Sequence, residues 1–294
     1  MNTTSTSATV AVIGLGNLGR ALAEAFLRDG HPTTVWNRSA AKATELVERG
    51  ATAQGTVGEA VAAGELVVVA VLNHEAALEV LSGVDVRGRA LVNLTSGSPN
   101  QARELARWAE SNGAEYLHGA VYAVPQTIGT EQSGVLYSGS SAVHERWRNV
   151  LALLGRVTFV GADPGRASGY DVAILAAMYG LLGGFLHGAA VAKAEGIAVG
   201  DLTPLMSSWL TDLQPALVTF AEEIDSGEYG TDESSLAMNQ SGLGTLIEAS
   251  ESVGVPAAVL GPLKELVDRQ VADGHGALSL ARAVESFASP AGAR

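Results

Sequence analysis

The chain of 294 residues contains no cysteine and few basic residues. Without cysteine there are no disulfide bonds, thiolate metal sites or thiol nucleophiles. Only 18 Lys and Arg residues stand against 31 Asp and Glu residues, so the formal net charge is −13. Such a charge repels nucleic-acid phosphates and the anionic face of a membrane, and we expect neither as a partner. Charged residues make up 17% of the chain and hydrophobic ones 47%, which excludes a disordered protein.

Two stretches bear on targeting. Residues 1–7 are polar and lack the basic region of a signal peptide, so we expect a cytoplasmic protein. Residues 172–192 carry no charge and are long enough to span a bilayer. They are rich in Ala and Gly and lack aromatic belts, and glycine recurs every four residues at Gly180, Gly184 and Gly188. We therefore expect a buried helix of a soluble protein, at the centre of a helical domain or at a subunit interface.

The first half of the chain alternates strand patterns with helix patterns. Apolar runs predict strands at residues 8–13, 33–36, 66–71, 90–93, 116–123, 135–138 and 157–160. Helical periodicity with glycine stops predicts helices at residues 17–29, 40–49 and 100–111. This alternation is typical of βαβ units, and so of a parallel sheet.

The pattern changes at a turn cluster near residue 163. Beyond it we expect only helices, at residues 166–195, 202–226, 236–252, 257–272 and 278–287. The predicted fold class is therefore α/β, with an N-terminal Rossmann parallel-sheet domain over residues 1–163. An all-α C-terminal domain over residues 164–294 follows, and a long helix joins the two domains.

A glycine-rich turn lies between the first predicted strand and the first predicted helix. It matches G-x-G-x-x-G, in which Gly14 permits a tight turn, Gly16 lets a pyrophosphate approach the backbone and Gly19 lets helix and strand pack closely. The helix start supplies free N–H donors to the anion. An ordinary glycine-rich turn is the alternative, but the strand–turn–helix context favours a dinucleotide site. Its predicted cofactor-binding residues are Gly14, Leu15, Gly16, Asn17, Leu18 and Gly19.

The end of the second predicted strand indicates which dinucleotide is bound. An NAD site usually places a carboxylate there to accept a hydrogen bond from the ribose 2′-hydroxyl. This chain instead has Asn37, Arg38 and Ser39, with Lys42 following, and all four can donate to a 2′-phosphate. We therefore predict NADPH as the cofactor. The alternative for Arg38 is a solvated surface cation.

Two polar residues on the long predicted helix are candidates for the chemistry. A nicotinamide cofactor implies hydride transfer, and the substrate is expected where the helical half meets the carboxyl ends of the strands. Asp171 and Tyr179 stand there among apolar neighbours, and either could donate a proton or hold a cationic substrate. An aspartate pKa of ~3.9 is too low for an acid at neutral pH, but burial raises it. Alternatively, Asp171 is a carboxylate favoured by the helix dipole and Tyr179 a packed core aromatic.

Several segments resemble one enzyme family. Residues 10–19, 30–31, 34–39, 92–99, 136–139, 178–179 and 184–190 are similar to those of NADPH-dependent imine reductases. These are relatives of the β-hydroxyacid dehydrogenases, in the 6-phosphogluconate dehydrogenase-like superfamily. The resemblance covers nearly the whole chain. It implies hydride transfer from NADPH to the C=N carbon of an imine or iminium ion, which gives an amine. Cyclic imines are the expected preferred substrates. The resemblance also places Asn93, Thr95 and Ser96 among the cofactor-binding residues.

The chain departs from the hydroxyacid dehydrogenases at residues that matter for their chemistry. Their lysine near the start of the long helix, with an asparagine four residues on, is matched here by Asp171 and Leu175. Imine reductases commonly carry Asp or Tyr at the lysine position, where a carboxylate would stabilise an iminium cation and a lysine would repel it. Some also have a tyrosine where Tyr179 falls, so the proton donor stays open between Asp171 and Tyr179.

Other functions are kept as alternatives. The second candidate enzyme is a β-hydroxyacid or semialdehyde dehydrogenase or reductase using NADP(H). A cofactor-binding regulator without turnover is a third possibility. The family resemblance also implies a homodimer with shared active sites, and it implies a substrate pocket lined by Tyr122, Met178, Trp209 and Met238. Ordinary core packing is the alternative for Trp209 and Met238. The six histidines lack metal-ligand spacing, so we expect no metal.

Overall fold

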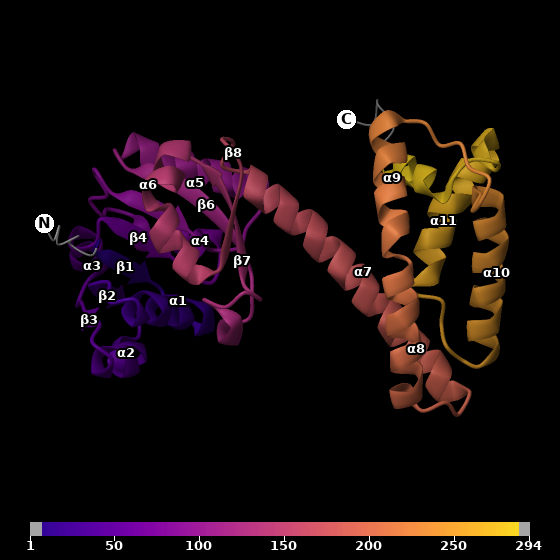
Figure 1. The fold of residues 1–294 in the computed structure, drawn as a ribbon, viewed down its shortest axis with the longest axis horizontal. Helices are drawn as coiled ribbons and strands as arrows, with labels where there is room; N and C mark the ends of the chain where they lie inside the picture. The colour runs from indigo at the N-terminus through magenta and orange to yellow at the C-terminus, as the bar shows by residue number, and fades with distance from the viewer. Residues whose placement is uncertain (1–7, 288–294) are drawn as a thin grey trace, which may run out of the picture. The chain divides into compact units, whose positions relative to one another are not determined.

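A computed structural model describes residues 8–287, which form two compact units (Figure 1). The first, which we call the sheet unit, extends to Ala176, and the second, the helical unit, begins at Ala177. Each is described by itself. The polar residues 1–7 lie outside the described residues, so the absence of a signal peptide there stays a prediction.

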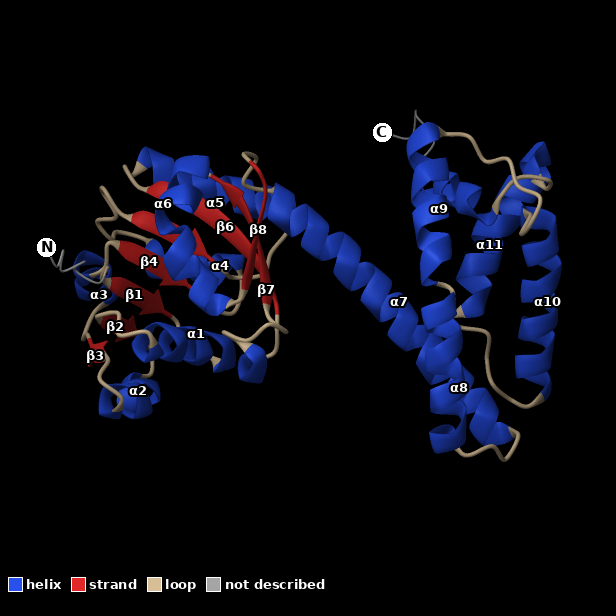
Figure 2. Ribbon diagram, viewed as in Figure 1, coloured by secondary structure: helices blue, strands red, loops and turns tan. Residues whose placement is uncertain are grey.

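The sheet unit is built on one eight-stranded sheet (Figure 2). The strand order is β3-β2-β1-β4-β5-β6-β7-β8. The strands are β1 (Val10–Ile13), β2 (Thr33–Trp36), β3 (Thr52–Ala53), β4 (Leu66–Val69), β5 (Ala90–Asn93), β6 (Glu115–Tyr122), β7 (Gly134–Gly139) and β8 (Arg156–Gly161). The predicted class, a sheet-based N-terminal domain followed by helices, is confirmed.

One strand pair differs from the predicted parallel sheet. All neighbouring strands are parallel except β6 and β7, which pair antiparallel from Leu117 opposite Gly139 to Tyr122 opposite Gly134. A parallel pair needs a crossover of a dozen or more residues, usually an α-helix. The segment between β6 and β7 holds only the short 3₁₀ helix η2 (Pro125–Thr127), so the chain turns back as a hairpin instead.

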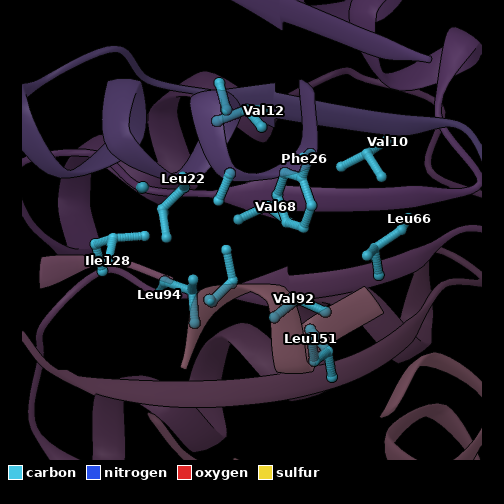
Figure 3. Packing of buried hydrophobic residues seen from close by; sticks show 14 of the residues in the cluster. Val10, Val12, Leu22, Phe26, Leu66, Val68, Val92, Leu94, Ile128 and Leu151 are labelled. Atoms are coloured by element: carbon cyan, nitrogen blue, oxygen red, sulfur yellow. The ribbon is translucent and has the colours of Figure 1, made fainter. Parts of the chain in front are cut away.

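Helices cover both faces of the sheet. They are α1 (Asn17–Arg28), η1 (Ala40–Ala43), α2 (Thr44–Glu48), α3 (Val57–Ala63), α4 (His74–Leu81), α5 (Pro99–Ser111), α6 (Ser141–Leu151) and η3 (Ala152–Leu154). One apolar core contains Val12, Phe26 and Leu151 (Figure 3), and a second contains Ile13 and Leu105. The strands of the sheet therefore bury apolar side chains on both faces, as their continuous apolar runs predict.

Three helices, α3, α4 and α6, were not predicted from the sequence. All three begin with recognisable local signals. Thr56 and Glu59 form a capping box at the start of α3, the Asn73 side chain caps α4, and the Ser140 side chain caps α6. The helices are short, so their hydrophobic periodicity is weak. The capping residues are the sequence signal that could have predicted where these helices begin.

The helical unit contains the rest of the chain. Its elements are α7 (Arg166–Ala194), which begins in the sheet unit, α8 (Val199–Asp212), α9 (Gln214–Ser226), α10 (Leu236–Ser252), α11 (Leu260–Gln270), the π turn η4 (Val271–His275) and the 3₁₀ helix η5 (Leu280–Phe287). The single helix predicted over residues 202–226 is wrong. It is two helices, because Pro215 has no N–H to continue the hydrogen-bond ladder and so stands in the first turn of a new helix.

The boundaries of the predicted domains and of the compact units fall at different places. The predicted division at residue 163 lies just before α7, whereas the compact units divide inside α7, after Ala176. Because α7 continues from one unit into the next, the chain has no linker there that would mark a domain boundary. The division into residues 1–163 and 164–294 stays a prediction.

The apolar surface of α7 is exposed in the described chain. The helix is long and apolar enough to cross a membrane by length and composition, with a mean hydropathy of 1.6 in its most apolar window, and none of that window is buried. Leu181 is 51% exposed and Leu186 is 67% exposed. The expectation of a buried helix is therefore not met within one chain.

Candidate functional site

A cavity of about 790 Å³ lies at the carboxyl ends of the central strands. It is lined from the turns that follow β1, β2, β4 and β5. The strand order reverses at β1, which pairs with β2 on one side and β4 on the other, and open α/β sheets bind ligands at such a switch point. The predicted cofactor residues that line this cavity are Gly14, Gly16, Asn17, Leu18, Gly19, Asn37, Arg38, Lys42 and Ser96.

The three motif glycines serve different purposes. Gly14 has a φ of 98°, and a Cβ there would overlap the carbonyl of Ala70. A Cβ at Gly19 would overlap the carbonyl of Gly14, so both positions require glycine for packing. A Cβ at Gly16 would meet nothing within 4 Å, and Gly16 is exposed and lines the cavity. The bare backbone at Gly16 therefore leaves room for a phosphate.

The start of α1 offers hydrogen-bond donors to this space. Gly16 is the N-cap residue of α1, and no side chain caps the helix. The amides of its first turn are therefore available to an anion, which the helix dipole also favours. The pyrophosphate of a dinucleotide fits this cradle.

Asn37 braces the glycine turn. Its Oδ1 accepts a hydrogen bond from the backbone N–H of Leu15 at 2.9 Å, and its Nδ2 donates to the carbonyl of Ser39 at 3.1 Å. The side chain of Leu15 is buried in the core, and Ser39 is exposed but does not line the cavity. Asn37 thus both lines the cavity and fixes its loops, whereas Leu15 and Ser39 do not line the cavity.

Two cations remain for a 2′-phosphate. Arg38 and Lys42 line the same cavity, and both are exposed. The residues directly after β2 include no carboxylate that could bind a ribose 2′-hydroxyl. The Nη2 of Arg38 lies 3.3 Å from Oε2 of Glu79 on α4. The donor set therefore fits NADPH, with its phosphate oxygens matched by the guanidinium and ammonium groups.

The three cofactor-binding residues predicted at the end of β5 and in the loop after it differ in their exposure to the cavity. Asn93 and Thr95 are buried, and only Ser96 lines the cavity. The backbone N–H of Thr95 donates to Asn93 Oδ1 at 3.1 Å, and the N–H of Val71 donates to Thr95 Oγ1 at 3.1 Å. Asn93 and Thr95 therefore join the loops after β4 and β5 and shape the floor of the cavity.

A buried polar network connects this floor to α7. Nδ2 of Asn93 lies 3.3 Å from the hydroxyl of Tyr116 and 3.4 Å from Nδ1 of His118. Nε2 of His118 lies 2.7 Å from Oγ of Ser168 in the first turn of α7. Burial lowers the pKa of His118 to about 4, so the ring is neutral. Since Nδ2 of Asn93 can only donate, Nδ1 of His118 accepts and Nε2–H donates to Ser168.

No sequence motif pointed to this network. His118 and Ser168 are 50 residues apart in the chain, and neither belongs to a recognisable pattern. Their pairing depends on the packing of α7 against β6, which only the tertiary structure provides.

Asp171 and Tyr122 come together at the end of β6. Tyr122 is the last residue of that strand, and Asp171 lies in the second turn of α7. Burial and the negative charge of Asp171 raise the pKa of Tyr122 to about 12. Burial also raises the pKa of Asp171, and the hydroxyl of Tyr122 offsets part of that rise. The Tyr122 hydroxyl is buried, and none of its contacts within residues 8–287 meets the distance and angles of a full hydrogen bond, so it acts on the carboxylate as a nearby, imperfectly aligned donor.

The remaining predicted residues belong to the helical unit. Tyr179 is 68% exposed, Trp209 64%, Met238 55% and Met178 39%. None of the four is buried in the described chain. Their roles in catalysis and substrate binding stay predictions.

Among residues 8–287, no group of three or more His, Asp or Glu side chains is placed to hold a metal ion.

Known proteins match both parts of the chain. Residues 9–161 match the model of the NAD binding domain of 6-phosphogluconate dehydrogenase, and residues 163–289 match the model of the C-terminal domain of NADPH-dependent reductive aminase-like proteins. An NADPH-dependent reductive aminase of Aspergillus oryzae is 39% identical over 95% of this chain and 96% of its own length.

Solved structures agree with this result. A reductive aminase from Aspergillus terreus in complex with NADPH and ethyl levulinate has a TM-score of 0.91 and 39% identity, covering 96% of this chain and 100% of its own. An imine reductase from the same organism in complex with NADPH4 and dibenz[c,e]azepine also has a TM-score of 0.91, with 38% identity and the same coverage.

Proposed function

Because this chain belongs to the family of NADPH-dependent reductive aminases and imine reductases, we propose that Asp171 anchors the iminium form of the substrate during reduction. The protein is an NADPH-dependent oxidoreductase that reduces imines to amines. When bound, NADPH supplies the hydride that the C=N carbon accepts. The roles of individual residues, the preferred substrates and the assembly are our proposals.

Different residues of the chain bind different parts of the cofactor. The uncapped start of α1 and the bare backbone of Gly16 hold the pyrophosphate. Arg38 and Lys42 hold the 2′-phosphate, and Ser96 contributes a hydroxyl to the same cavity. Asn37 and the buried pair Asn93 and Thr95 fix the loops that carry these groups.

The observation that carries the proposed mechanism is the pairing of Asp171 with Tyr122. An imine is reduced most readily as its iminium cation, and an ionised carboxylate stabilises that cation. Burial raises the pKa of Asp171 and so favours its protonated form, and a protonated carboxyl is the form that can hand a proton to the imine nitrogen. Tyr179 on the same helix is the other candidate donor.

We propose cyclic imines as preferred substrates, and ketones combined with small amines as further ones. The relatives support this choice, since their structures hold an azepine in one case and a keto ester in another. The test is the oxidation of NADPH followed by its absorbance. We expect oxidation with a cyclic imine, and none with a 3-oxo acid or a semialdehyde acid. Oxidation with the acids alone would support a hydroxyacid or semialdehyde reductase, and tight NADPH binding without any turnover would support a regulator.

We also propose that the chain forms a homodimer with shared active sites. Along α7, a Cβ at Gly180 or Gly184 would meet nothing within 4 Å, so this stripe is open, whereas Gly188 is already occupied by Met206 of α8. The open stripe and its exposed leucines match a close helix–helix contact with a second copy. We also propose that the protein is cytoplasmic and stays soluble without detergent. Recovery in the membrane fraction of a lysate would contradict that location.

A further inference from the structure

Glu79 occupies an unusual place for an acidic residue in a site that binds a phosphate. It lies on α4 and lines the same cavity as Arg38, which follows β2. The carboxylate Oε2 lies 3.3 Å from Nη2 of Arg38, so the ion pair joins the β2 side of the cavity to the α4 side. The guanidinium expected to bind the 2′-phosphate is thus already matched to a carboxylate of the protein.

The strength of this ion pair matters for its effect. Both partners are largely exposed, 78% for the Arg38 side chain and 70% for that of Glu79, so water screens their attraction and the pair is easily opened. A phosphate can take the planar guanidinium through two parallel hydrogen bonds and carries more negative charge than a carboxylate. Arg38 would therefore favour the 2′-phosphate of a bound cofactor over the Glu79 carboxylate.

Displacement leaves a like charge beside the ligand. Glu79 loses its partner when Arg38 turns to the phosphate, and its carboxylate stays on the wall of the same cavity. Two negative groups a few ångströms apart in water repel each other by an amount comparable to the attraction that was lost. No such repulsion acts on a cofactor without the 2′-phosphate.

We propose that Glu79 is a competing counter-ion for Arg38 that selectively weakens the binding of NADPH and NADP⁺. The carboxylate neutralises the guanidinium in the free enzyme and opposes the phosphate in the complex. Its effect is to keep the oxidised cofactor exchangeable, so that NADP⁺ leaves after each turnover. The inference rests on the proposed assignment of Arg38 to the 2′-phosphate.

The test compares Glu79→Gln with the unchanged protein, both without cofactor. Calorimetry measures the dissociation constants of NADPH, NADH and adenosine 2′,5′-bisphosphate. We expect the variant to bind NADPH and the bisphosphate about three- to tenfold more tightly at low salt, with little change for NADH. The gain shrinks at high salt because the charges are exposed. Stopped-flow displacement of NADP⁺ shows a slower release by a similar factor.

The matched control is Glu45→Gln. Glu45 is also an exposed carboxylate paired with an arginine, Arg20, at 2.8 Å, but it does not line the cavity. We expect this variant to bind all three ligands as the unchanged protein does. A general effect of net charge would tighten binding equally in both variants and overturn the proposal.

Further outcomes distinguish the role of Glu79 from the assignment of Arg38 to the 2′-phosphate. If Glu79→Gln leaves NADPH binding unchanged, weakens it or tightens NADH equally, Glu79 is not a competitor for the phosphate. If Arg38→Ala weakens NADPH and NADH binding alike, the assignment of Arg38 fails as well. A selective effect of Arg38→Ala together with no effect of Glu79→Gln overturns the role of Glu79 alone.

Discussion

The neutral ring of His118 donates a hydrogen bond from Nε2 to Oγ of Ser168 over 2.7 Å. This bond joins the middle of β6 to the first turn of α7, three residues before Asp171. Both partners are buried, so the bond is protected from competition by water. It fixes how the helix that carries the candidate catalytic carboxyl leaves the sheet.

The burial of His118 predicts a pH dependence of stability. Its folded-state pKa of about 4 lies below the ordinary value of 6.5, so the unfolded chain binds a proton that the folded protein excludes. The stabilisation is complete above pH 6.5 and is lost as the pH falls toward 4, at up to about 1.4 kcal/mol per pH unit. Denaturant unfolding of the protein at several pH values between 4 and 6.5 measures this slope.

His118→Gln provides the control for that measurement. The amide keeps a donor for Ser168 but cannot titrate, so the slope between pH 4 and 6.5 should become smaller. The carboxyls of Asp85 and Asp163 are paired with arginines that lower their pKa values to about 2. They therefore change the pH dependence of stability below pH 4, outside the range of this measurement. An unchanged slope would show that His118 is not the group responsible.

Arg38→Ala tests the choice of cofactor. Removing a charged partner of the 2′-phosphate should raise the dissociation constant and the KM of NADPH about 10- to 100-fold. NADH lacks that phosphate and should be affected much less. Steady-state kinetics with both cofactors, together with calorimetry, check the difference. Equal losses for the two cofactors would remove the assignment.

Asp171→Asn tests the catalytic role of the carboxyl. The amide is close in size but cannot carry the charge that stabilises an iminium ion or donate an acidic proton. We expect kcat/KM for a cyclic imine to fall about 100-fold or more, with the NADPH dissociation constant unchanged. Unaltered turnover would transfer the role to Tyr179 or to water, and Tyr179→Phe is the next variant to measure.

Tyr122→Phe should shift the pH profile of the reaction. Burial raises the pKa of Asp171, and the Tyr122 hydroxyl opposes that rise by stabilising the carboxylate. Without the hydroxyl the pKa of Asp171 rises further, so the carboxylate forms only at higher pH. The acid limb of kcat/KM should therefore move to higher pH, and an NMR titration of the Asp171 carboxyl in the cofactor-free protein should show the same shift.

Tyr137→Phe is the matched control for the Tyr122 variant. Tyr137 is fully buried and its hydroxyl also has no hydrogen-bond partner in the described part of the chain. Its core contains apolar side chains of the sheet and its helices, not Asp171. The Asp171 titration should therefore be unaffected by Tyr137→Phe. An equal shift in both variants would mean that loss of packing, rather than loss of the phenol, changes the pKa.

Leu186→Glu tests the proposed dimer. Leu186 is 67% exposed on α7 in the single chain, and a charge at a helix–helix contact would be buried without a partner. We expect light scattering to show a dimer for the unchanged protein and a monomer for the variant. Val47→Glu, at a 46% exposed position on α2, should leave the dimer intact. A monomeric and active unchanged protein would rule out shared active sites.

Several parts of the site could be predicted because their signals are local. The glycine turn and the residues after β2 lie within short segments whose chemistry can be recognised without knowing the fold. Strands β2 and β5 and helix α10 were predicted with their observed bounds, since periodicity and turn residues define them. Strand β7 was predicted, but its antiparallel direction was not, because a strand pattern carries no information about the direction of the neighbouring strand.

By itself, the sequence determined the two-part α/β and α-helical class, the phosphate-binding turn and the positive charge next to it. Each of these depends on residues that are close neighbours in the chain, where steric limits and charge act without help from the fold. Only the tertiary structure decided that Asn37 braces Leu15, that His118 meets Ser168, that Tyr122 adjoins Asp171 and that Glu79 faces Arg38. These pairs join distant segments, and they form because the packing of helices on the sheet brings polar groups together.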